Sequence, residues 1–465
     1  MVAIRRMTES STKMSVPSAK LHQRKLVSCQ QEAALLNWTV LSLFSGAGGL
    51  DLGLEAGGWQ ILVQVDLDPG AVETLCMGAE KRAYETRIFP EPIERVSPSL
   101  LRRSLGLRRG ELGLLAGGPP CQPFTTSGLR QAMNDQRASS LFPAYFRFIE
   151  EFRPRAVLLE NVDGMLSAAL RHRPLKFRGK DHAPLAPEEL KGSFLRRLVD
   201  ELVELGYSVT WGVVEAADYG VPQMRQRAIL IGVRGGEPCY LPPPTHGREG
   251  LTPYRTLHDG LAGVKELGPV QPLSERKRRV YRLIPPGGNW RNLPDPTRRA
   301  TMGAAYFAEG GKSGWWRRLS WNLPAPTILG MPDHSSTALI HPDEVRCLSV
   351  NECAALQTFP SDTLFGGTPR SQYQQIGNAV PSLLGQRLGD HLVRFLEGER
   401  FAPPDPPRWR KVSANRRIGT HGWAIRQRTG PEYHLIVKVR PDHIWSGVTA
   451  PVLFNPEDLE PRVAV

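Results

Sequence analysis

A short apolar run that ends in a rigid loop constrains this chain more than any other feature. Residues 112–116 (LGLLA) are apolar throughout, which is typical of a buried strand. The residues from Gly117 to Pro120 end that strand and hold Cys121 in a tight turn. Open α/β sheets bind ligands at the carboxyl edge of their strands, where this loop would lie. A thiol fixed there is placed to act as a nucleophile, although a lone cysteine in a loop is more often an idle thiol.

Another strand followed by a turn is predicted near the amino-terminal end, where the patterned part of the chain begins at residue 39. Residues 39–44 (TVLSLF) predict a strand, and Gly49 to about Ala56 predict a helix. The glycines between them, Gly46 and Gly48, would let the backbone approach a nucleotide-like ligand closely. Their spacing departs from the dinucleotide fingerprint GxGxxG, so the turn alone does not identify the ligand.

The next apolar run, residues 61–65, ends at Asp66, about twenty residues after the glycine turn. An acidic residue at this place typically accepts hydrogen bonds from ribose hydroxyls. Asp68 precedes Pro69 and instead predicts a helix N-cap. Asp66 is therefore the better ligand candidate.

Glu160 follows a strand of the same kind. Residues 156–159 (AVLL) are apolar throughout, as in a strand that is covered on both faces. This strand delivers Glu160 to the edge of the sheet that carries Cys121. A carboxylate there is either a capping group or an acid catalyst, and its position beside the thiol loop favours catalysis.

Three polar residues alternate just before another buried strand: Gln223, Arg225 and Arg227. A two-residue spacing predicts that they point the same way. Alternating arginines can form a solvated edge, but beside an acid and a thiol they indicate a clamp for an anion or a base.

The composition of the chain indicates the kind of binding partner and the cellular compartment. The net charge of +13 indicates a polyanionic partner, most simply nucleic acid. The six cysteines are scattered without CxxC or zinc-like spacing, which indicates reduced thiols in a cytoplasmic protein and no metal site. We find no apolar run long enough to cross a membrane and no secretory signal.

Shifts in composition divide the chain into five parts. We expect a disordered basic tail over residues 1–36, a catalytic and cofactor-binding domain over 37–238, and an irregular domain rich in Pro, Gly, Arg and Trp over 239–341. Residues 342–400 again show helical patterning, and we expect them to complete the catalytic domain. Residues 401–465 are predicted to form a linker and a small basic β-appendage. In the irregular domain, residues 315–321 (WWRRLSW) suit phosphate contact and base stacking, or else a Trp core with Arg outside.

The features above belong to a series of seven motifs that follow one another along the chain: LSLFSGAGGLDLGL, VDLD, GGPPCQPF, ENVDG, QMRQR, RCLSVNECAALQTFP and QQIGNAVP. In this order the chain resembles the DNA cytosine-5 methyltransferases of bacterial restriction–modification type, from Thr39 to about Leu396. The resemblance implies a Rossmann-like α/β fold that uses S-adenosylmethionine and no metal, with residues 239–341 as the target-recognition domain. It also implies double-stranded DNA as the partner, a functionally paired restriction endonuclease, and a cytoplasmic monomer that joins the nucleoid when bound to DNA.

The resemblance also assigns residues. It makes Cys121 the nucleophile, Glu160 the acid, and Arg225 with Arg227 the support for the target base. It places these residues at the cofactor: Phe44, Gly46, Gly48, Gly49, Asp66, Leu67, Ile93, Pro119, Leu141, Asn378 and Ala379. We also expect five residues to contact DNA: Gln122, Thr125, Ser127, Arg317 and Arg318.

Three positions depart from the family pattern. Ser42 stands where the family usually has Asp, Asp66 where it has Glu, and residues 91–93 (EPI) where an Asp commonly binds adenine. Two rival functions stay open: a transfer-RNA cytosine-5 methyltransferase on the same fold and a catalytically silent DNA-binding paralogue. The long region 239–341 argues against the first, and the pairing of Cys121 with Glu160 argues against the second.

Overall fold

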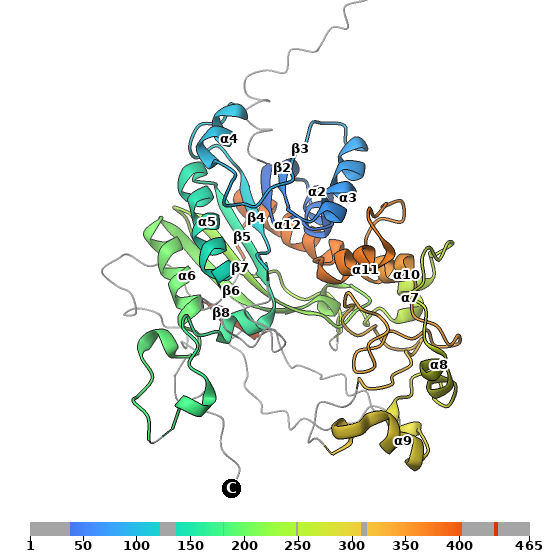
Figure 1. Ribbon diagram of the computed structural model, residues 1–465. Coiled ribbons are helices and arrows are strands. Elements are labelled where there is room, and N and C mark those ends of the chain that lie inside the picture. The colour runs from blue at the N-terminus through green and yellow to red at the C-terminus, as the bar shows by residue number, and fades with distance from the viewer. Residues whose placement is uncertain are drawn as a thin grey trace, which may run out of the picture.

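The computed structural model describes residues 38–120, 136–179, 181–247, 250–307, 314–401 and 432–435. One eight-stranded sheet with the order β3-β2-β1-β4-β5-β7-β6-β8 forms its centre (Figure 1). The strands are β1 (Thr39–Leu43), β2 (Gln60–Val65), β3 (Arg87–Phe89), β4 (Leu114–Gly117), β5 (Ala156–Asn161), β6 (Tyr207–Glu215), β7 (Gln226–Arg234) and β8 (Glu432–Leu435).

The first five strands in space pair in parallel, from β3 to β5, whereas β7 lies antiparallel between β5 and β6. Because parallel strands share one direction, the turns that follow β1, β2, β4 and β5 all lie at one edge of the sheet. This edge, which we call the carboxyl edge, brings together the glycine turn, Asp66, the start of the thiol loop and Glu160. The predicted Rossmann-like α/β fold is confirmed.

Helices lie on both faces of the sheet. The helices that the structure describes are α2 (Gly49–Ala56), α3 (Pro69–Glu80), α4 (Pro98–Ser104), α5 (Gln136–Phe152), α6 (Ser193–Glu204), α7 (Leu257–Leu261), α8 (Glu275–Arg282), α9 (Asp295–Met302), α10 (Val350–Leu356), α11 (Pro369–Asn378) and α12 (Ser382–Leu396). Those from α7 to α10 lie away from the sheet, in the part of the chain that follows β7 (Figure 1). Leu41 and Leu115 share one core with α4, α5 and α6, while Val40 and Leu114 share another with α2 and α12. Burial on both faces explains why β1 and β4 are apolar without alternation.

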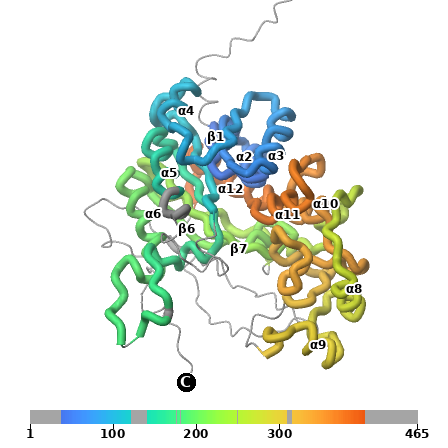
Figure 2. The backbone as a smooth tube through the Cα atoms, viewed as in Figure 1, coloured from blue at the N-terminus to red at the C-terminus, as the bar shows by residue number. Residues whose placement is uncertain are grey.

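The last helix returns to the first. A Cβ atom on Gly53 of α2 would lie 2.2 Å from the carbonyl oxygen of Ser382, and one on Gly385 of α12 would lie 2.9 Å from that of Leu50. Only glycine permits backbones to approach so closely. Figure 2 shows the two helices, blue and orange, side by side. The segment after residue 342 thus packs on the amino-terminal part of the sheet.

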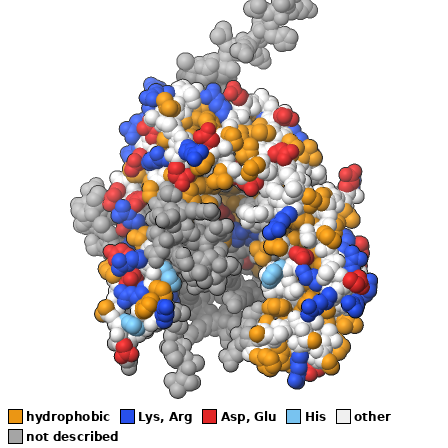
Figure 3. Space-filling view, viewed as in Figure 1, with side chains coloured by type: hydrophobic (Ala, Val, Ile, Leu, Met, Phe, Trp, Pro, Cys, Tyr) orange, Lys and Arg blue, Asp and Glu red, His pale blue; other side chains and the backbone are white. Residues whose placement is uncertain are grey.

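The region between β7 and α10 has short helices and long irregular stretches, as its composition predicts. A cluster of buried side chains holds part of it together, among them Tyr281, Leu293, Met302 and Trp316. In the space-filling view, viewed as in Figure 1, this region forms the lower right of the surface (Figure 3).

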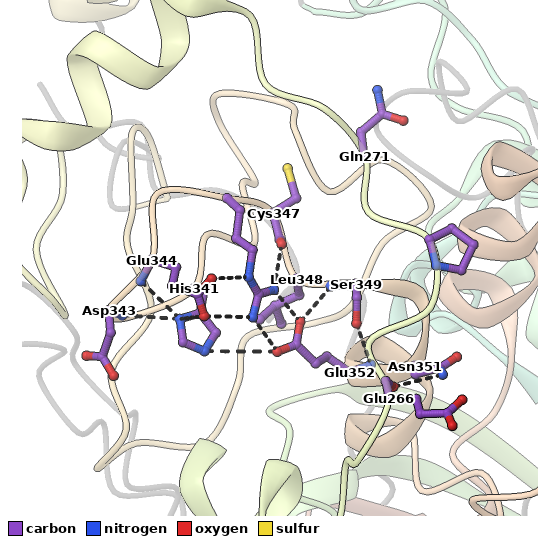
Figure 4. Close-up of polar contacts among 12 residues, drawn as sticks. Glu266, Gln271, His341, Asp343, Glu344, Cys347, Leu348, Ser349, Asn351 and Glu352 are labelled. Carbon is purple, nitrogen blue, oxygen red and sulfur yellow. Dashed lines mark hydrogen bonds and ion pairs between the residues drawn. The ribbon is translucent and has the colours of Figure 1, made fainter.

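An ion-paired cluster lies where this region meets residues 342–400, which we call the return segment (Figure 4). Arg346 donates to both carboxylate oxygens of Glu352, at 2.6 and 2.9 Å, and the backbone N–H of Ser349 also donates to that carboxylate. His341 accepts the backbone N–H groups of Asp343 and Glu344 on Nδ1. Burial lowers the pKa of His341, in agreement with a ring nitrogen that acts as an acceptor.

Some elements differ from the prediction. Two elements of residues 79–109 were not predicted, β3 and α4. Strand β3 is too short to leave a pattern, whereas Ser97 and Pro98 cap α4 in the usual way. Strand β8 falls in the predicted β-appendage and pairs with β6 at the edge of the main sheet. The predicted tail over residues 1–36 lies outside the described residues. In the part of the chain that the structure describes, no helix is long and apolar enough to cross a membrane.

Candidate active site

Glu160 and Arg227 form an ion pair at the carboxyl edge. Glu160 is the last residue but one of β5 and Arg227 the second residue of β7, its antiparallel neighbour, so the two side chains meet across the pair of strands. Arg227 Nε lies 2.7 Å from Glu160 Oε1, and both side chains are about nine-tenths buried. Arg227 is the member of the predicted arginine pair that reaches the acid.

Burial raises the pKa of Glu160, and the guanidinium groups of Arg227 and Arg225 oppose that rise. The carboxyl group therefore holds a proton more readily than an exposed glutamate. A protonated carboxyl can donate a hydrogen bond or a proton to a base beside it.

The thiol loop starts against this acid. A Cβ atom on Gly118 would lie 3.0 Å from Glu160 Oε2, so a larger residue there would crowd the carboxylate. Asn161 donates its side-chain amide to the carbonyl oxygen of Pro119 at 2.9 Å and fixes the direction in which the loop leaves β4. Cys121 follows two residues later and lies outside the described residues, as do Gln122, Thr125 and Ser127.

Arg225 has a different place from the one predicted. Its side chain is fully buried and donates to the carbonyl oxygens of Ile328, Gly377 and Ala379 at 2.7–2.9 Å. Gln223 is also buried and bonds to Gln357 and to the backbone of Ile328. The expectation that Gln223, Arg225 and Arg227 point the same way is wrong, because the first two precede β7 and bind residues of the irregular region after β7 and of the segment after residue 342.

The glycine turn after β1 has the shape that a close ligand approach requires. Phe44, Gly46 and Gly48 all have positive φ, at 57°, 54° and 74°. The carboxylate of Asp66 accepts the backbone N–H of Gly46 on one oxygen at 2.7 Å and that of Asp68 on the other at 2.9 Å. Burial raises the pKa of Asp66, and these N–H donors oppose the rise. Asp68 caps α3 through Ala71, as predicted.

The other predicted cofactor residues differ in burial. Ala379 lies against Gly49, since a Cβ atom on that glycine would be 3.0 Å from the Ala379 side chain. Asn378 at the end of α11 and Leu67 after β2 are exposed, Leu67 to 63%. Leu141 is half-buried, and the remaining two are buried, namely Ile93 and Pro119.

A buried carboxylate beneath the turn was not foreseen. Asp51 accepts hydrogen bonds from Ser42 Oγ and from Gln64 Nε2, both at 2.6 Å, and burial raises its pKa. Ser42 is therefore a donor to Asp51, and an aspartate at position 42 would set two buried carboxylates side by side. The only signal in the sequence was the combination of Ser42 with an acid on the first turn of α2.

Arg317 and Arg318 are not placed to contact DNA. Both are more than nine-tenths buried. Arg318 donates to the carbonyl oxygens of Ile284 and Pro342, and Arg317 to that of Ala338. The segment was predicted to contact DNA, or else to form a Trp core with Arg outside; here Trp316 is buried, but both arginines lie in the interior as well and donate to backbone carbonyls of the irregular chain. Exposed arginines occur instead on α8: Arg276, Arg278 and Arg279.

Comparisons with known proteins bear on this site. The family model described as C-5 cytosine-specific DNA methylase matches residues 38–394. The type II methyltransferase M.Sau96I of Staphylococcus aureus is 32% identical over 361 residues, which cover 77% of this chain and 76% of that protein. M.Eco47II of Escherichia coli is 32% identical over 370 residues, covering 77% and 80%.

The fold has a solved counterpart. The structure of a protein described as a DNA modification methyltransferase encoded within an E. coli prophage has a TM-score of 0.52 and 21% identity, covering 77% of this chain and 99% of that one. The family match spans strands β1 to β7, the irregular region after β7 and most of the segment that returns to the sheet. The chain belongs to the C-5 cytosine-specific DNA methylase family.

Proposed function

We propose that this protein adds a methyl group to carbon 5 of a cytosine flipped out of double-stranded DNA, with Cys121 as the nucleophile and Glu160 as the acid. Family membership supports the reaction, and the names of the relatives, type II methyltransferases, support a restriction–modification setting with a paired endonuclease. The observation that carries the residue assignment is the buried Glu160–Arg227 pair against Gly118, three residues before Cys121.

The chemistry requires these residue types. Carbon 5 of cytosine is a weak nucleophile, and a thiolate that bonds to carbon 6 makes the ring electron-rich at carbon 5. The added electron pair moves toward N3, where Glu160 donates a proton, and Arg227 offsets charge near the exocyclic oxygen. Carbon 5 takes the methyl group, and S-adenosylhomocysteine is the leaving group. A water molecule then accepts the proton on carbon 5, the bond between carbon 6 and the Cys121 sulfur breaks to release the thiolate, and N3 returns its proton to Glu160, which restores the ring. The base must first leave the duplex, because its ring faces are stacked there.

The turn after β1 suits S-adenosylmethionine, which supplies the methyl group when bound. Asp66 accepts the backbone N–H groups of Gly46, Leu67 and Asp68, and since a carboxylate has about four acceptor positions, one is left for a ribose hydroxyl. Leu67 offers an exposed apolar surface to a flat ring, and Ala379 lies against Gly49, directly after the turn. In this proposal Asp66 binds and orients the cofactor, while Asp51 and Ser42 hold the turn from beneath.

Replacing Asp66 by alanine is expected to weaken S-adenosylmethionine binding by about 1.5–3 kcal/mol, the usual value of a hydrogen bond to a charged group. Titration calorimetry measures this directly. Asp68→Ala is the matched control: it removes the N-cap of α3, with a cost in stability of about 0.5–2 kcal/mol, but no cofactor contact. An unchanged dissociation constant for Asp66→Ala would remove Asp66 from the site.

Bisulfite sequencing tests the function as a whole. Host DNA that lacks other cytosine-5 methylation should gain protected cytosines in one short sequence context when the protein is expressed. The Cys121→Ser variant, expressed to the same level, should leave no protected cytosines. Protection that appeared only in transfer RNA would favour the RNA enzyme instead, and purified protein that binds DNA but methylates neither substrate would favour the silent paralogue.

A further inference from the structure

The segment between β5 and α6 has no part in the reaction described above. We call residues 168–192 of this segment the basic arm. It contains six lysines and arginines against three acidic residues, and also two histidines. Its excess of positive charge is concentrated on one short connection, which favours contact with a polyanion.

The basic arm starts near the carboxyl edge, because it follows β5, which carries Glu160 near its carboxyl end. In Figure 1 it is the green segment that projects below α6, on the left of the view, while α8 and α9 of the recognition region lie on the right. The described surface in Figure 3 accordingly has two lobes in its lower half, one from each region. A duplex whose base enters the site at this edge would pass between them.

Hydrogen bonds give the basic arm a defined shape. The buried carboxylate of Glu189 binds Arg173 and accepts the backbone N–H of Ala186 at 2.9 Å. Arg173 also donates to the carbonyl oxygen of Ala183, and Arg178 donates to that of Arg173. These hydrogen bonds lower the pKa of Glu189, Arg173 first among them, so its charge persists at neutral pH. Arg173 and Arg178 are therefore structural residues of the arm.

Two other cations of the arm face solvent. Arg171 keeps 58% of its side chain exposed although it lies 3.3 Å from Glu189. Lys176 is exposed and makes no ion pair with any residue that the structure describes, and its ammonium lies 4.8 Å above the ring of Phe177. Phe177 is itself 48% exposed. A cation and an exposed ring on a braced loop suit the phosphates and sugars of a nucleic-acid backbone.

We infer that the basic arm binds the phosphate backbone of duplex DNA, on the side of the site opposite the recognition region. The inference rests on the proposed function, since it takes DNA as the substrate. Contacts of this kind hold the duplex without regard to sequence, and they release counterions from it. The arm would thus steady the DNA on the catalytic side while the recognition region selects the sequence.

The test compares two double variants that remove the same charge. Arg171→Ala with Lys176→Ala alters the arm, and Arg103→Ala with Arg108→Ala alters exposed arginines near the opposite edge of the sheet, between α4 and β4. Binding of a methylatable duplex and of a scrambled one is measured at several salt concentrations. The arm variant should bind both duplexes more weakly and lose about two from the slope of log K against log salt, because each lost phosphate contact removes about 0.9. The control pair should keep the wild-type slope.

Kinetics gives a second readout. The arm variant should raise KM for DNA and keep kcat at saturating DNA, because neither side chain reaches the base. Thermal unfolding checks that the arm remains folded. If the double variant melts early, Lys176→Ala is tested alone, since that side chain makes no ion pair among the described residues. The single variant should lose about one from the slope of log K against log salt. Equal slopes for arm, control and wild type would overturn the inference. Wild-type methylation in the same preparations separates this outcome from failure of the proposed function.

Discussion

Replacing Cys121 by serine is expected to abolish methyl transfer while DNA binding persists. A serine hydroxyl is almost entirely protonated at neutral pH and is a far weaker nucleophile than a thiolate, so the bond to carbon 6 does not form. Transfer of a labelled methyl group to DNA measures the loss. DNA that contains 5-fluorocytosine should form a covalent complex with the wild type and none with the variant.

A matched control uses another thiol of the chain. Cys76 lies exposed on α3, so Cys76→Ser should keep both the rate and the covalent complex. This control excludes a general effect of losing a cysteine. Methylation by Cys121→Ser at a near wild-type rate would contradict the mechanism and leave the loop with a structural role.

Replacing Glu160 by glutamine should lower the rate by about 10²–10⁴, the usual contribution of a positioned acid. Glutamine keeps the size of the side chain but cannot supply a carboxylic proton to N3. Because burial raises the pKa of Glu160, the wild-type rate should fall as the pH rises through that pKa and the proton is lost. The glutamine variant should not show this fall.

The ion pair with Arg227 complicates this measurement, since breaking a buried pair from one side destabilises a protein by about 3–5 kcal/mol. The double variant Glu160→Gln with Arg227→Met removes both charges and should recover much of the stability. Its rate should stay low, because the acid is still absent. A double variant that regained activity together with stability would make Glu160 a structural partner of Arg227 and not the acid.

The buried arginines show how the irregular regions of this protein are held. Arg225 and Arg318 each donate to backbone carbonyl oxygens from distant parts of the chain. Segments without helices or strands leave such carbonyls without the usual partners, and a guanidinium supplies several donors in one plane. In the part of the chain that the structure describes, Arg225, Arg317 and Arg318 are thereby used inside the protein, which makes the exposed cations of the basic arm and of α8 the better candidates for DNA contact.

The sequence by itself determined the sheet, the carboxyl edge and the family. Apolar runs, the glycine turn and caps such as Asp68 act over a few residues, so β1, α2 and β5 lie where their patterns predict them. Glu160 reaches the same edge as the loop of Cys121 because parallel strands share a direction, which the patterns already imply. The roles of the individual residues at this edge remain predictions.

Only the tertiary structure decided where the long polar side chains go. Arg225 and Arg227 stand two residues apart, yet one binds the return segment and the other binds Glu160. Ser42 finds its partner in Asp51, and Ala379 lies against Gly49, directly after the glycine turn, from the far end of the chain. The physical reason is that a flexible side chain follows whichever carbonyl or carboxylate lies within reach. In the folded protein those groups come from segments that no local pattern connects.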